Sequence, residues 1–258
     1  MSGWTVTSLA PGIWNFYEEA PGTAVDAYLV CGSQRAVMID ALQDARGVYH
    51  KVRELTSLPV ELLLTHGHYD HAGPAVEEFY QAGYPVWMQE DDVPVLGTMG
   101  GRGLPAEFFR PLEDGQVFDL GGRALKTLLL PGHTPGSAVF LDEEDQLAFS
   151  GDSIGSGPFW LQLAHSLSVA EFLPNAKRFW EAVEGWEHLR IYPGHQNQSP
   201  EPLGKEYLRD VIATAQGILS GALAGPVETM VAGGQSLPYG VVAQGKMLGF
   251  FYSPNRIR

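Results

Sequence analysis

The side chains best suited to chemistry in this chain lie close together, between His66 and His71. Three imidazoles and one carboxylate, from His66, His68, His71 and Asp70, fall within that segment, although the whole chain of 258 residues has only eight histidines. Imidazole nitrogen and carboxylate oxygen are ligands that Zn²⁺, Mn²⁺ and Fe²⁺ accept. The cluster therefore predicts a metal centre.

Three later segments share one pattern, in which an apolar stretch ends in a turn of small residues with a single ligand-type side chain. These side chains are His133, Asp152 and His195, and each directly follows a glycine. A glycine at that position allows a sharp turn and a close approach of the side chain to a shared centre. The candidate metal ligands are then His66, His68, Asp70, His71, His133, Asp152 and His195.

This set is too large for a single catalytic Zn²⁺, which takes about three protein ligands and a water molecule. Two metal ions about 3.5–4 Å apart can share one carboxylate and hold a hydroxide between them. We therefore expect a binuclear centre with two divalent metal ions. Zn²⁺ is the expected metal, with Fe or Mn as alternatives.

The elements around the cluster are predicted to place it at the end of a strand. Residues 58–64 form an apolar run typical of a buried strand, and a helix is expected from Pro74 to Gln81. A strand-to-helix loop at the carboxyl end of a strand is where α/β sheets usually hold their functional groups. Further strands are expected over 4–7, 13–17, 25–31, 36–39, 85–88, 116–118, 124–130, 137–141, 147–149, 190–192, 227–231, 240–242 and 247–252.

Helices are expected over residues 44–56, 169–183 and 203–223, with Ser168 as the cap of the second. Residues 93–115 are rich in glycine and proline and are predicted to form a long loop. The order of strands and helices favours a mixed α/β fold. We expect a single domain over residues 1–258, with a core at about 4–198 and a C-terminal extension of helix and strand over 199–258.

Composition restricts the partners. The net charge of −14 argues against nucleic acid, because binding a polyanion needs a basic face. The sequence contains no run of about 18 apolar residues, so no membrane span is predicted. The first residues lack the pattern of an export signal, so none is expected. The single cysteine, Cys31, is typical of a cytoplasmic protein. A small-molecule substrate is expected. The sequence leaves open whether the chain forms a homodimer.

Taken in order, the H-x-H-x-D-H segment, the later G-H, the G-D and the final P-G-H resemble the metallo-β-lactamase superfamily. The resemblance covers about residues 24–198 and implies a four-layer αβ/βα sandwich of two mixed β-sheets with helices on the outer faces. It also implies which residues share an ion. One ion would be held by His66, His68 and His133, a second by Asp70, His71 and His195, and Asp152 would bridge them.

Within that superfamily the chain looks most like the glyoxalase II-type (hydroxyacylglutathione hydrolase) thioesterases and the lactonases. The antibiotic-hydrolysing members commonly lack the bridging aspartate, whereas Asp152 is present here. We expect a bridging hydroxide to cleave an ester-like bond, a thioester or a lactone, with Asp70 as ligand and proton relay. The alternatives are an iron-dependent redox enzyme of the same fold, of persulfide dioxygenase or di-iron reductase type, a phosphodiesterase and a β-lactamase.

Five further residues are candidates for supporting roles. Asp40 resembles the family's aspartate that orients a ligand histidine, and the alternative is an ordinary turn residue at a strand end. Thr134 either supports a ligand or satisfies its own turn. Phe159, Trp160 and His165 follow Asp152 in an expected loop that would line the substrate pocket, although aromatic residues also build cores.

Overall fold

The structure is a computed structural model that describes residues 3–20, 23–155, 157–196, 203–232, 234–243, 245 and 249–258. Its first sheet has the strand order β1-β2-β3-β4-β5-β6-β7. The hairpins from β1 to β4 pair antiparallel, and β4 to β7 pair parallel. The strands are β1 (Gly3–Ala10), β2 (Ile13–Ala20), β3 (Thr23–Cys31), β4 (Ala36–Ile39), β5 (Val60–Leu63), β6 (Val86–Met88) and β7 (Phe109–Pro111).

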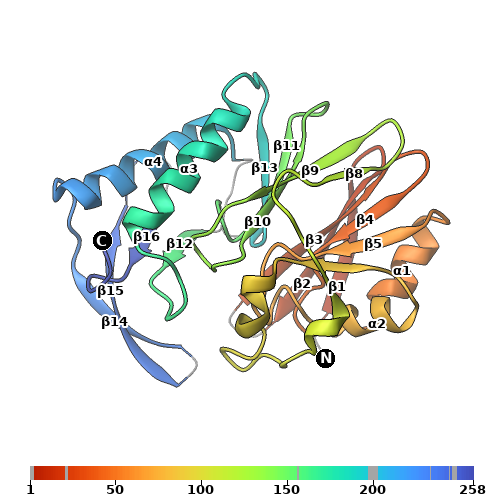
Figure 1. Ribbon diagram of the computed structural model, residues 1–258, viewed down its shortest axis with the longest axis horizontal. Coiled ribbons are helices and arrows are strands. Elements are labelled where there is room, and N and C mark those ends of the chain that lie inside the picture. The colour runs from red at the N-terminus through yellow and green to blue at the C-terminus, as the bar shows by residue number, and fades with distance from the viewer. Residues whose placement is uncertain are drawn as a thin grey trace.

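The second sheet has the order β13-β11-β10-β9-β8 and is also mixed, because only β11 and β13 pair parallel. Figure 1 shows α1 and α2 on one side of the molecule and α3 and α4 on the other. The elements are β8 (Val117–Asp119), β9 (Ala124–Leu129), β10 (Ala138–Asp142), β11 (Leu147–Gly151), β13 (Arg190–Pro193), α1 (Val48–Leu55), α2 (Ala75–Gln81), α3 (Val169–Val183) and α4 (Lys205–Ser220).

Alternation along the strands builds the layers. In β4, Met38 belongs to the core beneath α1 and α2, whereas Val37 and Ile39 belong to the core between the two sheets. In β10, Phe140 faces that same inner core and Val139 joins the core beneath α3 and α4. Successive side chains of a strand point to opposite faces, so each sheet separates two cores. The two sheets and their outer helices form the predicted four layers.

A third sheet, with the order β12-β16-β15-β14, was not expected as such. The sequence predicts a loop after Asp152, but the segment forms β12 (Pro158–Leu161), which pairs in parallel with β16 (Gly249–Tyr252). Phe159 drives this pairing, because its ring packs against the rings of Phe172 and Phe250. The sheet is completed by β14 (Val227–Ala232) and β15 (Gln235–Val242).

Several predicted boundaries need correction. The first helix begins at Val48 because the carboxylate of Glu78 accepts the backbone N–H groups of Gly47 and Tyr49 and so caps its first turn. The expected loop over 93–115 contains short helices, η1 (Glu90–Val95) and η2 (Ala106–Phe108), and the strand β7. By contrast, α3 has the predicted bounds and the predicted cap at Ser168.

Helix α4 starts two residues later than expected because Leu203 pairs with Ile191 in an isolated β-bridge. It ends at Ser220, and Gly221 caps it with a left-handed φ of 75°. Among the described residues, no helix combines the length and the hydropathy that a bilayer crossing needs.

Candidate metal centre

The histidine-rich segment over 65–71 follows shortly after the end of β5. Asp40 forms hydrogen bonds with both ends of this segment. The carboxylate of Asp40 accepts the backbone N–H of Thr65 at 2.7 Å and its hydroxyl at 2.8 Å. The same carboxylate lies 2.9 Å from Nδ1 of His71. Asp40 itself has a φ of 63°, a left-handed conformation that turns the chain sharply after β4. The geometry places Asp40 where an aspartate that orients a histidine must lie.

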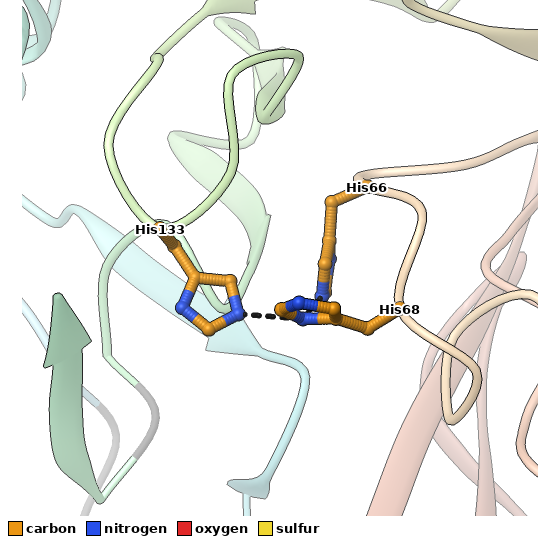
Figure 2. Close-up of side chains that lie close together, drawn as sticks. All are labelled: His66, His68 and His133. Carbon is orange, nitrogen blue, oxygen red and sulfur yellow. Dashed lines mark hydrogen bonds between the residues drawn. The ribbon is translucent and has the colours of Figure 1, made fainter. Parts of the chain in front are cut away.

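His66, His68 and His133 form one group of candidate ligands, called group one here. Nε2 of His66 lies 3.0 Å from Nδ1 of His68, and Nε2 of His133 lies 2.9 Å from the same atom. Figure 2 shows the three rings turned toward one another from two separate loops. All three side chains are buried. Group one therefore offers three nitrogens to a single point, as an all-imidazole metal site does.

The other ring nitrogens decide which atoms stay available in group one. Nδ1 of His133 lies 2.8 Å from the backbone carbonyl oxygen of Trp160. Because a carbonyl only accepts, that nitrogen must carry the proton, which leaves a lone pair on Nε2. Nδ1 of His66 lies 3.0 Å from the hydroxyl oxygen of Thr65. Because that hydroxyl donates its proton to the carboxylate of Asp40, Nδ1 of His66 must be the donor in this contact. Nε2 of His66 therefore also presents a lone pair to the centre.

Asp70, His71 and His195 form the second group, called group two here, and their ligand atoms lie within 4.8 Å of one another. Nδ1 of His195 bonds to the carbonyl oxygen of Ala24, and Nδ1 of His71 bonds to Asp40. Nε2 of His71 is fully buried and makes no hydrogen bond within the described part of the chain. A buried polar nitrogen without a hydrogen bond lowers the stability of the fold unless a cation binds to it. The residues present thus fit a metal ion.

Asp152 lies between the two groups. Its carboxylate oxygens are 3.4 Å from Nε2 of His71, 3.3 Å from Nε2 of His195 and 3.5 Å from Nε2 of His133. Burial alone would raise the pKa of Asp152, but the charges of His195 and His71, together with a hydrogen bond from His195, hold that pKa well below its usual range. The carboxylate is therefore ionised and faces ligands of both groups.

Two glycines allow this close packing. Gly151 has a φ of 50°, and a Cβ there would lie 2.2 Å from the hydroxyl oxygen of Thr65. A Cβ on Gly194 would lie 2.3 Å from the ring of His71 and 2.6 Å from the carboxylate of Asp152. A side chain at either position would push the ligands apart, so the G-D and P-G-H patterns have a steric cause.

Electrostatics distinguish the two groups. Burial lowers the pKa of all three imidazoles of group one, two of them well below the usual value, so these rings are neutral. In group two burial opposes charge, but Asp152 and Asp70 outweigh it. They raise the pKa of His195 to about 9 and that of His71 well above its usual value. Without a bound cation, group two therefore pairs imidazolium with carboxylate, whereas group one has no charge. A metal ion in group two would displace the imidazolium protons and take over their charge.

Asp92 is a buried residue of the site that sequence reasoning missed. Its carboxylate accepts the backbone N–H groups of Gly67 at 2.8 Å and Gly136 at 2.6 Å, and the hydroxyl of Thr134 at 2.7 Å. It thus joins the loop that bears His66 to the loop that bears His133. Burial raises the pKa of Asp92 to about 6, although the hydrogen bonds act in the other direction. Three successive acidic residues end at this position, and nothing in the sequence marks the last as buried.

The residues proposed for a substrate pocket have different positions. Phe159 is 0% exposed and belongs to the core beneath α3, so the prediction that it lines a pocket is wrong. The indole of Trp160 stacks on Phe251, with 6.3 Å between ring centroids, and its carbonyl accepts the hydrogen bond from Nδ1 of His133. His165 is partly exposed, and its Nε2 lies 2.7 Å from Nε2 of His68. It therefore contacts the candidate ligand His68 on the side that faces away from the centre.

A mixed α/β sandwich with buried imidazoles and carboxylates at the ends of its strands defines a class of metalloproteins. The sequence profile of the Metallo-beta-lactamase superfamily matches residues 20–206. The chain belongs to this superfamily.

Similarity to individual proteins is modest. The chain is 28% identical over 212 residues to acyl-coenzyme A thioesterase MBLAC2 of Gallus gallus, a match that covers 70% of this chain and 75% of that protein. It is 33% identical over 134 residues to hydroxyacylglutathione hydrolase GloC of Haemophilus influenzae, with 48% of this chain and 63% of that protein covered.

The fold also matches solved structures. A metallo-beta-lactamase from Pontibacter korlensis superimposes with a TM-score of 0.66 at 18% identity. The match covers 83% of this chain and 99% of the other. At this identity the likeness concerns the fold alone.

Proposed function

We propose that this chain is a binuclear metal-dependent hydrolase that cleaves a thioester. The observation that carries the proposal is the position of Asp152, within 3.5 Å of imidazole nitrogens from both ligand groups. A carboxylate in that position suits two ions that share one ligand. The names of two relatives, an acyl-coenzyme A thioesterase and a hydroxyacylglutathione hydrolase, both describe thioester cleavage and support the choice of bond.

The residues would divide the work by group. Group one would hold one Zn²⁺ and group two the other, with Asp152 facing both. When bound, such ions lower the pKa of water from about 15.7 to near 7 and polarise the carbonyl of the substrate. The chain itself supplies rigid ligands, since Asp40 fixes His71 and the carbonyl of Ala24 fixes His195. Their second nitrogens are thereby kept aimed at the centre.

Asp70 is the group that we assign to proton transfer. Its side chain is 14% exposed, and Oδ2 lies 3.5 Å from Nε2 of His195. In thioester hydrolysis the water oxygen forms a bond to the carbonyl carbon, and the C–S bond then breaks. Asp70 would take the proton of the attacking water and return it to the departing thiolate. A thiolate is a good leaving group, so no stronger acid is required.

The proposal is tested by metal analysis together with a substrate panel. We expect two equivalents of zinc per chain and the highest kcat/KM on an acyl-coenzyme A or S-lactoylglutathione. The panel also contains an acyl-homoserine lactone, nitrocefin and bis(p-nitrophenyl) phosphate. Preference for the lactone would keep the binuclear hydrolase and change the bond. Iron with oxygen consumption, or a single metal equivalent in the fully loaded protein, would contradict the proposal.

We also propose a small-molecule substrate and a cytoplasmic setting. The net charge of −14 disfavours a nucleic-acid partner, and the lone cysteine suits a reducing compartment. A homodimer is compatible with these properties, and sedimentation analysis of the zinc-loaded protein would decide between monomer and dimer.

A further inference from the structure

The C-terminal residues contact the loop that bears His165. The guanidinium of Arg256 donates to three backbone carbonyls of this loop, those of Leu163, Ala164 and Ser166. The bond to Ala164 measures 3.0 Å and that to Ser166 measures 2.7 Å. These carbonyls flank His165 on both sides. One side chain from the end of the sequence therefore fixes the backbone on either side of this histidine.

Two more contacts fasten the same region. The backbone N–H of Ala170, in the first turn of α3, bonds to the carbonyl oxygen of Ile257 at 3.0 Å. The hydroxyl of Ser166 donates to the carbonyl oxygen of His133 at 2.8 Å. The loop between β12 and α3 is thus held by the C-terminal segment on one side and by a ligand of group one on the other.

The ring of His165 lies against the nitrogen of His68 that faces away from the centre. Nδ1 of His68 points to the other nitrogens of group one, at 2.9 and 3.0 Å, so it must present a lone pair to a cation. Its proton then lies on Nε2, which is 2.7 Å from Nε2 of His165. His165 accepts that hydrogen bond when its own proton is on Nδ1. A partner of this kind fixes the tautomer and the orientation of a ligand histidine.

We propose that His165 is the positioning residue for His68, and that Arg256 holds His165 in place. The C-terminal segment over 249–258 would then complete the metal centre, although it contributes no ligand. Neither residue needs to touch substrate. This inference rests on the metal centre of the proposed function and deepens it.

The test is a zinc titration of metal-free protein against a chromophoric chelator. We expect His165→Ala to weaken one of the two zinc equivalents by about 10- to 100-fold, because loss of such a partner usually has this effect. His165→Gln should recover most of the affinity, since its amide oxygen can accept the same bond. His188→Ala removes an exposed histidine of the same chain and should leave both equivalents unchanged.

Arg256 is tested in the same titration. Arg256→Ala should weaken the same zinc equivalent to a smaller extent. Arg178→Ala serves as the matched control, because this arginine of α3 bonds to Asp114 and to the carbonyl of Leu129 instead of to the loop of His165. The double variant His165→Ala/Arg256→Ala should bind zinc no more weakly than His165→Ala alone, because both residues act through His68. Thermal unfolding of each metal-free variant shows whether it is folded.

The outcomes separate this inference from the proposed function. If the unchanged chain fails to bind two zinc ions, the binuclear centre is wrong. If the unchanged chain binds two but His165→Ala binds both with unchanged affinity, only the positioning role is wrong. Additive losses in the double variant would show that Arg256 does not act through His165. Failure of His165→Gln to recover affinity would show that the hydrogen bond is not the cause.

Discussion

The two ligand groups are built differently. Group one consists of neutral imidazoles, and two of its rings are supported by late parts of the chain, the carbonyl of Trp160 and the ring of His165. Group two combines imidazole with carboxylate, and its backing comes from the first sheet, through Asp40 and the carbonyl of Ala24. One centre therefore depends on both halves of the sandwich. Any change in how the halves meet should alter group one and group two unequally.

The largest effect is expected where the two groups meet. Asp152→Ala should lower kcat/KM by roughly 10³-fold or more, which corresponds to about 4 kcal/mol of transition-state stabilisation. It removes the carboxylate that lies within 3.5 Å of imidazole nitrogens from both groups, so the two ions would no longer share a ligand. Steady-state kinetics on the preferred thioester measures the loss. Turnover within tenfold of the unchanged chain would show that the groups do not share Asp152.

Removing one ligand from each group separates them directly. His133→Ala disrupts group one and His195→Ala disrupts group two, so each variant should retain one zinc equivalent of the original two. The retained ion should differ between the variants, because the intact ligands differ. Elemental analysis after dialysis gives the stoichiometry, and competition with a chelator gives the affinity. Loss of both equivalents in either variant would show that the centre binds its ions only as a unit.

Asp92 should make the stability of the chain depend on pH. The pKa of Asp92 is raised to about 6, so the folded state favours its protonated form. Its contribution to stability is complete below the usual aspartate pKa and is lost as the pH rises through about 6. Relative to Asp92→Asn, the unchanged chain should lose about 2 kcal/mol of unfolding free energy between pH 4 and 7.

Urea unfolding at several pH values measures this difference. Asp92→Asn is compared with the unchanged chain at each pH, and the difference between the two unfolding free energies should shrink as the pH rises through about 6. Parallel curves for the two chains would contradict the assigned cause. The result would also show whether the link between the two histidine loops acts through an ionised carboxylate.

Sequence reasoning was most successful where local pattern dictates structure. The alternating strands and the cap at Ser168 both depend on neighbouring residues. It failed at β12, because that strand exists only when Phe159 meets Phe250, which lies 91 residues later. It also missed Asp92, whose three partners lie on two other loops. Contacts between residues distant in the chain leave no periodic signal, and such contacts hold group one.

The smallest effect should come from a local cap that lies close to group one but does not act on it. The hydroxyl of Ser168 accepts the N–H of Glu171 at 3.2 Å and completes a capping box at the start of α3. Ser168→Ala should therefore lower the unfolding free energy by about 1 kcal/mol. It should leave zinc affinity unchanged. Ser166→Ala provides the contrast, because that hydroxyl bonds to the carbonyl of His133. If Ser168→Ala weakened zinc binding as much as Ser166→Ala, the support of group one would lie in α3 rather than in the His165 loop.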